Sequence, residues 1–270
     1  MKKKLSIVTT AIFAVSLVFC SMVMWSGHLE GAESETESVS AQGKNTDKLV
    51  IVIDPGHGGM DGGASSADGT MEKDINLEIA VKLKEIMEDY PVEVIMTRDS
   101  DVSLHSDSSV SIKNQKRQDL LKRKEIIDQS GAELAICIHL NSFKEDASVY
   151  GAQVFYPKAN IARTDGRTYE HDSKQYAESV QKSIETNISD GRERSVMSKG
   201  DFLVFENPTC PMVLVECGFL SNKSEGEKLK NPEYQGKMAS AIWQGINENL
   251  CLEKETNMEI IESTNKQQKK

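Results

Sequence analysis

Short aliphatic runs alternate with longer segments of helical periodicity over most of this 270-residue chain. Runs that are apolar at every position are typical of strands buried on both faces. We therefore predict an α/β fold, a single domain with a largely parallel, twisted central sheet of about six strands and helices on both faces. The predicted strands are 49–54, 92–96, 134–139, 151–156, 202–205 and 212–216. The predicted helices are 73–89, 112–129, about 172–187 and 234–250.

The first 25 residues differ from this pattern. Lys2, Lys3 and Lys4 precede an uncharged, mostly apolar stretch at 5–25. About 20 apolar residues are enough for a helix to cross a bilayer, and flanking lysines favour its cytoplasmic side. We expect residues 1–25 to be an uncleaved membrane anchor, because the stretch is long and no small-x-small cleavage site follows. A cleaved signal peptide is the alternative, and both predict an extracytoplasmic domain.

Two further segments are polar and lack aliphatic periodicity. Residues 26–47 are rich in Ser, Glu and Gly, so we expect a solvated linker. Residues 253–270 are similarly polar, so we expect a disordered tail. The predicted domain therefore spans 48–252.

Charge and cysteine content narrow the function classes. The net charge is −10, from 32 Lys and Arg against 42 Asp and Glu, so no broad basic surface favours nucleic acid. The five cysteines form no CxxC pair, which argues against a cysteine-ligated zinc site. We expect Cys137 and Cys217 to be small buried apolar residues. A disulfide between Cys210 and Cys217 stays open in an exported protein.

Ionisable residues follow or end three of the predicted strands. His57 follows the first, His139 ends the third and Glu216 ends the last. Functional groups of parallel sheets gather beyond the carboxyl ends of the strands, so these side chains should share one edge. Two histidines and a glutamate with an open fourth position are a hydrolytic zinc ligand set.

Glu72 is the favoured third ligand. It is separated from His57 by a glycine-rich segment, 60–70, that is flexible enough to fold Glu72 back. The alternative for Glu72 is an ordinary carboxylate in the first turn of a helix, where the helix dipole favours it.

Four motifs surround these residues: IVIDPGHGGMDGGA at 51–64, MEKDINLEIA at 71–80, ICIHLNS at 136–142 and VLVECGFLSN at 213–222. In this order they resemble the zinc-dependent N-acetylmuramoyl-L-alanine amidases, and the resemblance extends over about 49–250. It implies that His57, Glu72 and His139 hold one Zn²⁺ ion. It also implies that Glu216 is the catalytic carboxylate.

The resemblance implies that peptidoglycan is the substrate. The family cleaves the amide between the lactyl group of N-acetylmuramic acid and L-alanine. Zinc would polarise the carbonyl, while Glu216 would take a proton from water and pass it to the leaving amine. Asp54 is a candidate acceptor for a ligand histidine. Asn141 is a candidate substrate contact or loop-orienting residue.

Within the family, the membrane-anchored spore-cortex and germination-specific amidases resemble this chain most, because no wall-binding repeats accompany the domain. We therefore expect a role in spore cortex maturation. Glu206 stands where many relatives have a basic residue, which could alter substrate contacts or indicate dependence on a partner.

Three other functions stay open. A non-catalytic peptidoglycan-binding regulator would be expected to lose a ligand or the carboxylate, and all four positions are intact. A partner-activated amidase would need a membrane or wall protein to complete its zinc site. A zinc peptidase would act within the stem peptide instead.

Other polar residues have structural interpretations. We expect Arg98 and Arg123 to form structural ion pairs. We expect His28, His105 and His171 to be solvated surface residues, because their surroundings are polar.

Overall fold

The aliphatic runs pair into one six-stranded sheet in the order β2-β1-β3-β6-β4-β5. The computed structural model describes residues 48–105, 109–159, 161–162, 165–188 and 192–255. The strands are β1 (Leu49–Pro55), β2 (Val92–Met96), β3 (Leu134–Asn141), β4 (Gln153–Pro157), β5 (Met197–Lys199) and β6 (Met212–Phe219). Strands β2, β1, β3 and β6 are parallel, whereas β4 is antiparallel to β6 and parallel to β5. The predicted single α/β domain with a largely parallel sheet is confirmed.

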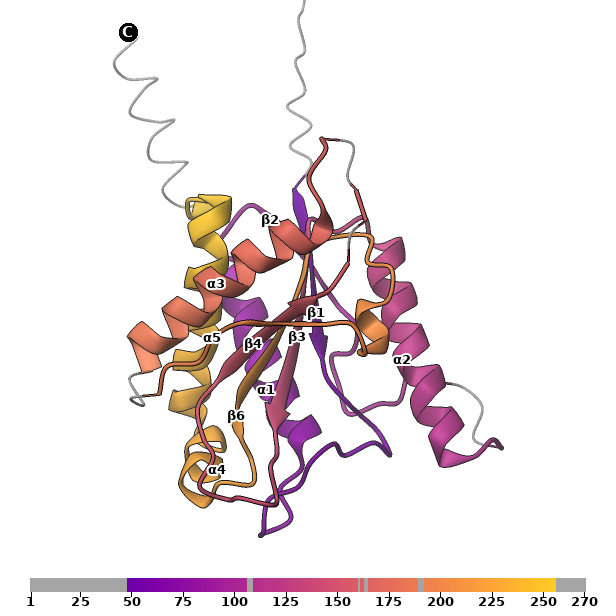
Figure 1. Cartoon of the computed structure of the whole chain (residues 1–270), viewed down its shortest axis with the longest axis vertical. Coiled ribbons are helices and arrows are strands. Elements are labelled where there is room, and N and C mark those ends of the chain that lie inside the picture. Colours follow the sequence, from indigo (N-terminus) through magenta and orange to yellow (C-terminus); the bar gives the residue numbers. More distant parts are fainter. Residues whose placement is uncertain (1–47, 106–108, 160, 163–164, 189–191, 256–270) are drawn as a thin grey trace, which may run out of the picture. The chain divides into compact units, whose positions relative to one another are not determined.

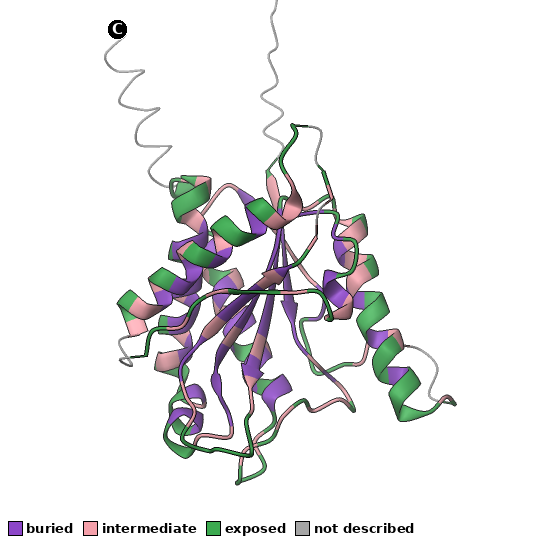
Figure 2. Ribbon diagram, viewed as in Figure 1, coloured by how far each residue is buried: buried purple, intermediate pink, exposed green. Residues whose placement is uncertain are grey.

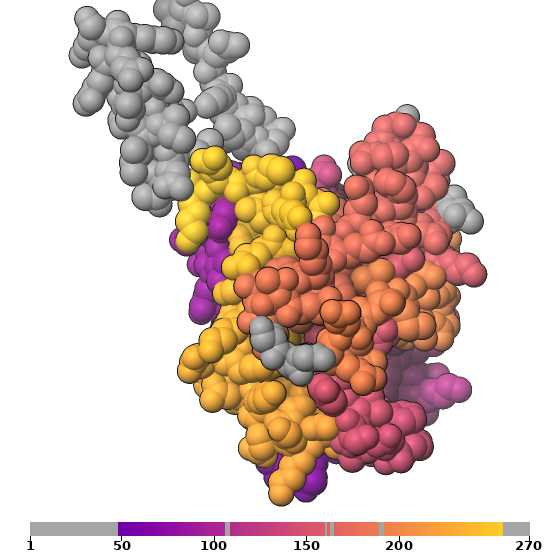
Figure 3. All heavy atoms as spheres, turned by 60° about the vertical axis from the view of Figure 1, so that its left-hand side comes forward, coloured from indigo at the N-terminus to yellow at the C-terminus, as the bar shows by residue number. Residues whose placement is uncertain are grey.

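Helices cover both faces of the sheet (Figure 1). Helices α1, α3 and α5 lie on one face, and α2 lies on the other with the short 3-10 helix η1. Figure 3 brings forward the side on which α3 and α5 pack together. The helices are α1 (Glu72–Met87), α2 (Ile112–Gln129), α3 (Tyr169–Ile188), η1 (Leu203–Phe205), α4 (Lys223–Leu229) and α5 (Pro232–Leu250).

Alternate strand side chains divide the apolar core into two layers. Ile51 and Ile53 of β1 pack in the layer beneath α1, α3 and α5. Val52 packs in the layer that includes Ile127 of α2 and Val204 of η1. The central strands are therefore buried on both faces (Figure 2), which explains their continuous apolar runs.

Residues 202–205 do not form the predicted strand. The Phe205 amide donates to the Phe202 carbonyl at 2.9 Å, and the Glu206 amide donates to the Leu203 carbonyl at 3.1 Å, as in a 3-10 turn. This apolar run packs beside α2 instead of pairing in the sheet. The sixth strand is β5, whose sequence Met-Ser-Lys has no aliphatic run that could indicate it.

Other elements extend the predicted pattern. Strand β3 continues beyond His139 to Asn141, and β6 continues beyond Glu216 to Phe219, so neither ionisable residue ends its strand. Helix α4 was not predicted, because its seven residues are too short for helical periodicity. The Asn222 side chain begins it by accepting from the Glu225 amide at 3.0 Å.

The cysteines of the core are free thiols. Cys137, Cys210 and Cys217 are buried, and none forms a disulfide. The Cys210–Cys217 alternative is therefore not realised, and the prediction of buried apolar roles for Cys137 and Cys217 is confirmed. Burial raises the pKa of all three thiols, which keeps them protonated and unreactive.

The predicted anchor at 1–25 and linker at 26–47 lie outside the described residues, as do residues 256–270 of the predicted tail. Among the helices that are described, none combines the length and apolar character that a bilayer crossing requires.

Candidate metal centre

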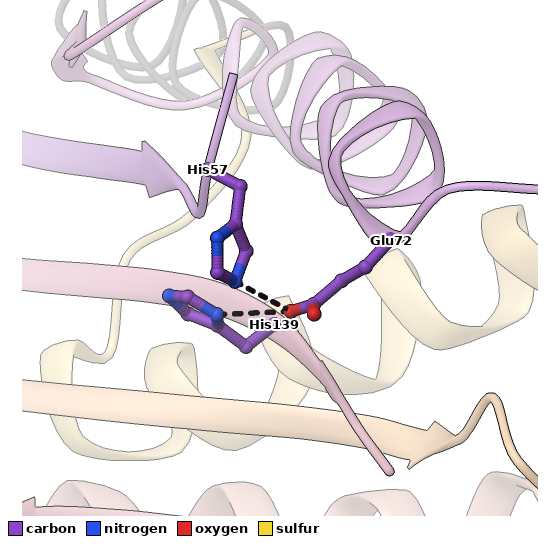
Figure 4. A group of neighbouring side chains, drawn as sticks. All are labelled: His57, Glu72 and His139. Carbon is purple, nitrogen blue, oxygen red and sulfur yellow. Dashed lines mark hydrogen bonds and ion pairs between the residues drawn. The ribbon is translucent and has the colours of Figure 1, made fainter. Parts of the chain in front are cut away.

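Three side chains converge at the carboxyl ends of β1 and β3 (Figure 4). His57, Glu72 and His139 each offer one ligand atom, and these atoms lie within 4.8 Å of one another. Oε1 of Glu72 lies 3.2 Å from Nε2 of His57 and 3.1 Å from Nδ1 of His139. The three predicted ligands therefore meet, although they come from a loop, a helix and a strand.

The turn after β1 gives His57 an unusual backbone conformation. Its φ is 61°, a region that residues other than glycine rarely adopt. Arg98 donates to the carbonyl oxygens of Pro55 and Gly56, each at 2.9 Å. Arg123 donates to the carbonyl of Pro55 at 2.7 Å and to that of His57. Two buried guanidinium groups thus hold this turn by its carbonyl oxygens.

Arg123 also lies at the centre of a buried ion-pair network. Its Nη1 is 2.7 Å from Oδ1 of Asp54, and its Nε is 2.7 Å from Oδ2 of Asp119. Burial opposes its charge, but these two carboxylates outweigh that effect and raise the pKa of Arg123. The predicted structural ion pair is confirmed for Arg123. Arg98 instead donates to backbone carbonyls, and burial near Arg123 lowers its pKa to about 10.

Glu72 begins α1, and the chain folds back around it. Its amide donates to the Ala64 carbonyl at 2.9 Å, while its Oε2 accepts from the Ala64 amide at 2.8 Å. Its Oε1 accepts from the Leu140 amide at 3.0 Å and from Nδ2 of Asn76 at 3.3 Å. The glycine-rich segment therefore returns Glu72 to the histidines, as predicted, and the carboxylate does more than occupy the first turn of its own helix.

Two glycines leave the space that the ligands occupy. A Cβ at Gly56 would lie 2.2 Å from Cε1 of His139. A Cβ at Gly63 would lie 2.5 Å from Oε2 of Glu72 and 2.7 Å from Cδ2 of His57. Larger residues at either position would displace a ligand side chain, so these glycines belong to the architecture of the site.

The charges of the ligand side chains depend on one another. Burial opposes a charge on His57, but hydrogen bonds to Asp61 and Glu72 outweigh it and raise the pKa of His57 to about 9. Burial also opposes a charge on Glu72, but hydrogen bonds from His139 and His57 hold its pKa well below its usual range. A charged carboxylate between two imidazoles fits the ligand preferences of Zn²⁺.

Glu216 lines a cavity of about 490 Å³ together with His57 and His139. Residues of α2 and η1 form its other walls. Burial raises the pKa of Glu216 to about 7, although the charge on His139 opposes the rise and that on Glu72 adds to it. Its Oε2 is buried and has no hydrogen-bond partner in the described part of the chain. A carboxyl group with a pKa near neutrality can both accept and return a proton.

The carboxylate that contacts a ligand histidine is Asp61. Its Oδ2 lies 2.9 Å from Nδ1 of His57. Asp54, the predicted candidate for such a contact, accepts from Oγ1 of Thr97 at 2.5 Å and pairs with Arg123. Sequence reasoning missed Asp61 because aspartate in a glycine-rich segment is typical of an ordinary turn. Its position four residues after His57 was the available signal.

The structure agrees with some of the predictions for the remaining polar residues and contradicts one. Oδ1 of Asn141 accepts from the Ser142 amide at 2.8 Å, which favours the loop-orienting alternative. His171 has a 60% exposed side chain, as predicted. His105 is half-buried, and its ring nitrogens are buried without a partner in the described residues, so a solvated His105 is wrong. Polar neighbours in sequence did not indicate how that loop packs. His28 lies outside the described residues.

Known sequences match this domain. A protein family described as N-acetylmuramoyl-L-alanine amidase matches residues 51–248. A germination-specific N-acetylmuramoyl-L-alanine amidase of Bacillus subtilis (strain 168) is 37% identical over 197 residues, which cover 73% of this chain and 78% of that protein.

Solved structures also match. The CwlD amidase from Clostridioides difficile, in complex with the GerS lipoprotein, is similar with a TM-score of 0.70 and 38% identity, covering 76% of this chain and 99% of that chain. An N-acetylmuramoyl-L-alanine amidase from Clostridium difficile 630 has a TM-score of 0.62 and 32% identity, covering 75% of this chain and 97% of that chain.

Proposed function

Because this chain belongs to the N-acetylmuramoyl-L-alanine amidase family, we propose that it hydrolyses its substrate at a zinc ion held by His57, Glu72 and His139. The amidase activity on peptidoglycan follows from the family and its curated members. The scissile bond is the amide between the lactyl group of N-acetylmuramic acid and L-alanine. The zinc ion and the residue roles are the proposal.

One observation carries the proposed site. The three candidate ligand atoms lie within 4.8 Å of one another, and two of these residues line the same cavity as Glu216. A bound zinc ion would supply Lewis-acid chemistry, activating water and polarising the carbonyl. The glycines at 56 and 63 support this assignment, because they leave the ligand side chains unobstructed.

Glu216 is the proposed proton carrier. Its carboxylate accepts a proton from the attacking water and returns it to the nitrogen of the departing L-alanine. In the metal-free protein the pKa of Glu216 is about 7, so neither protonation state is strongly disfavoured at neutral pH, which supports a role in proton transfer. Its Oε2 is buried and accepts no hydrogen bond from the described residues, so no described protein donor occupies that oxygen.

The products of purified peptidoglycan test this reaction. An amidase releases stem peptides that keep an intact L-alanine amino terminus, which mass spectrometry identifies. A zinc peptidase would release shorter peptides cut within the stem, and a non-catalytic regulator would release none. Either result would contradict the proposed reaction.

We propose that the enzyme acts outside the cytoplasm in spore cortex maturation. The similarity to a germination-specific amidase supports the spore setting. The apolar stretch at 5–25 supports membrane attachment as an anchor, with residues 26–47 as the linker to the wall. Immunodetection of the protein in membrane and soluble fractions of sporulating cells tests this location.

A partner protein is a second element of the proposal. The related CwlD amidase was solved in complex with a lipoprotein, which supports a partner for this chain as well. If the partner completes the zinc site, the isolated chain should retain zinc weakly and a candidate lipoprotein should increase the retention. Equal zinc retention with and without the lipoprotein would contradict partner activation.

A further inference from the structure

The segment after His57 forms a tight backbone turn that places a carboxylate on the imidazole. The Gly58 amide donates to the Asp61 carbonyl at 2.9 Å, and the Asp61 amide donates back to the Gly58 carbonyl at 3.1 Å. This reciprocal pair fixes where the Asp61 side chain begins. From there its Oδ2 reaches Nδ1 of His57 at 2.9 Å.

When the His57 imidazole is neutral, the contact favours the tautomer that carries its proton on Nδ1. An ionised carboxylate can only accept hydrogen bonds, so Nδ1 must be the donor. The other nitrogen, Nε2, lies 3.2 Å from Oε1 of Glu72 and therefore faces the candidate metal position. A neutral imidazole with its proton on Nδ1 presents the lone pair of Nε2 to a metal ion.

The second oxygen of Asp61 is also held. Lys116 of α2 donates from Nζ to Oδ1 at 2.7 Å, and the Gly63 amide donates to the same oxygen at 3.3 Å. With both oxygens engaged, the carboxylate has little freedom to rotate away from His57. The Lys116 side chain is about half exposed, at 49%, and it lines the cavity, so it links α2 to the ligand turn at the mouth of the site.

We propose that Asp61 is a positioning residue, which orients the His57 imidazole so that Nε2 faces the candidate metal position, and that Lys116 holds Asp61 in place. This inference deepens the proposed function and rests on the zinc site of His57, Glu72 and His139. Mutation of a carboxylate that holds a ligand histidine in this way typically lowers metal affinity 10- to 100-fold.

The experiment uses the full chain and three substitutions around this contact. Asp61→Ala removes the acceptor, Asp61→Asn keeps one acceptor oxygen without the charge, and Lys116→Met removes only the outer support. Asp68→Asn is the matched control, because Asp68 lies in the same glycine-rich segment and bonds Ser66, Thr70 and Lys230 instead.

Two measurements are made on each variant. The first is the zinc dissociation constant from competition with a chelator. The second is the ¹⁵N chemical shift pattern of the neutral His57 imidazole in metal-free protein at alkaline pH, which reports the tautomer directly. We expect Asp61→Ala to weaken zinc binding about 10- to 100-fold and to give a mixture of tautomers. Asp61→Asn and Lys116→Met should have zinc affinities between those of Asp61→Ala and wild type. Asp68→Asn should have the zinc affinity and the His57 tautomer of wild type.

The two measurements separate this inference from the proposed function. A His57 that keeps its Nδ1 proton in Asp61→Ala would overturn the positioning role, even if zinc affinity fell. Unchanged zinc affinity in Asp61→Ala would also overturn it. The proposed zinc site itself fails if wild type and His139→Ala bind zinc equally weakly, and the tautomer measurement still decides the role of Asp61 in that case.

Discussion

His139 of β3 and Glu216 of β6 are register partners in adjacent parallel strands. Register partners in neighbouring strands point to the same face of a sheet, and both residues line the cavity on the α2 side. A shift of either strand by one residue would turn its ionisable group into the opposite core layer. The pairing of two apolar strands therefore determines the relative placement of the proposed ligand and the proposed proton carrier.

Replacement of Glu216 should separate catalysis from metal binding. We expect Glu216→Gln and Glu216→Ala to lower turnover by about 10²- to 10⁴-fold, because neither side chain can accept the proton of water. Zinc content should stay at the wild-type level, since Glu216 is proposed to act beside the ligands. Product release from peptidoglycan and metal analysis of the same samples check both parts. Loss of zinc together with activity would mean that Glu216 is itself a ligand.

Alanine at position 56 should displace a ligand. The new Cβ would lie 2.2 Å from Cε1 of His139, so the ring must move. We expect Gly56→Ala to weaken zinc binding by about 10-fold or more, as measured by chelator competition. Gly200→Ala is the matched control, because its Cβ would meet only Cβ of Lys158 at 3.8 Å. Similar zinc affinities in the two variants would show that His139 is not a ligand.

Removal of zinc should make stability depend on the charge of His57. Its pKa in the folded, metal-free protein is about 9, above the ordinary value of 6.5. A raised pKa stabilises the protein fully below pH 6.5, and this stability is lost as the pH rises through about 9. The melting temperature of metal-free protein should therefore fall over this interval, and His57→Asn should remove that part of the decrease.

The same pKa predicts proton release on metal binding. His57 is mostly protonated at neutral pH in the metal-free protein, but a ligand imidazole must be neutral. Calorimetric titration with zinc in buffers of different ionisation enthalpy should detect a proton released from His57. If wild type and His57→Asn release the same number of protons on binding zinc, His57 is not a ligand.

Two glycines of α5 should respond to alanine in opposite directions. A Cβ at Gly245 would lie 2.5 Å from Cα of Val180 and 2.7 Å from the carbonyl oxygen of Ser179, both in the backbone of α3. We expect Gly245→Ala to reduce the free energy of unfolding by about 1–3 kcal/mol. A Cβ at Gly236 meets nothing within 4 Å, so Gly236→Ala should increase it by about 0.5–1 kcal/mol. Urea denaturation of both variants checks the sign of each change.

The sequence predicted the parts of the fold that depend on continuous burial. Strands β1, β3 and β6 lie in the middle of the sheet, and their apolar runs follow from packing on both faces. Strand β5 lies at the edge and, within the described part of the chain, pairs with β4 alone, so no hydrophobic pattern was needed there. The run at 202–205 is apolar because it packs beside α2, which a strand prediction cannot distinguish from sheet pairing.

The candidate site was predictable where a residue follows a strand or belongs to a motif. His57 and His139 were indicated by their strands, and Glu72 by its motif. Asp61 was missed although it lies only four residues after His57, and the arginines were predicted as ion-pair residues but not as donors to the ligand turn. Arg123 reaches the carbonyl oxygens of Pro55 and His57 because α2 packs on the sheet. The spacing of these residues along the sequence does not predict that contact.

The carbonyl oxygens around His57 are held by hydrogen bonds from the guanidinium groups of Arg98 and Arg123. Because these hydrogen bonds fix the backbone of the turn, the position of His57 would already be defined when a metal ion binds. Little of its binding free energy would be spent on ordering the chain. The enzyme could then lose its ion and accept another without rebuilding the scaffold, and spectra of stripped and reloaded protein should superpose over this turn.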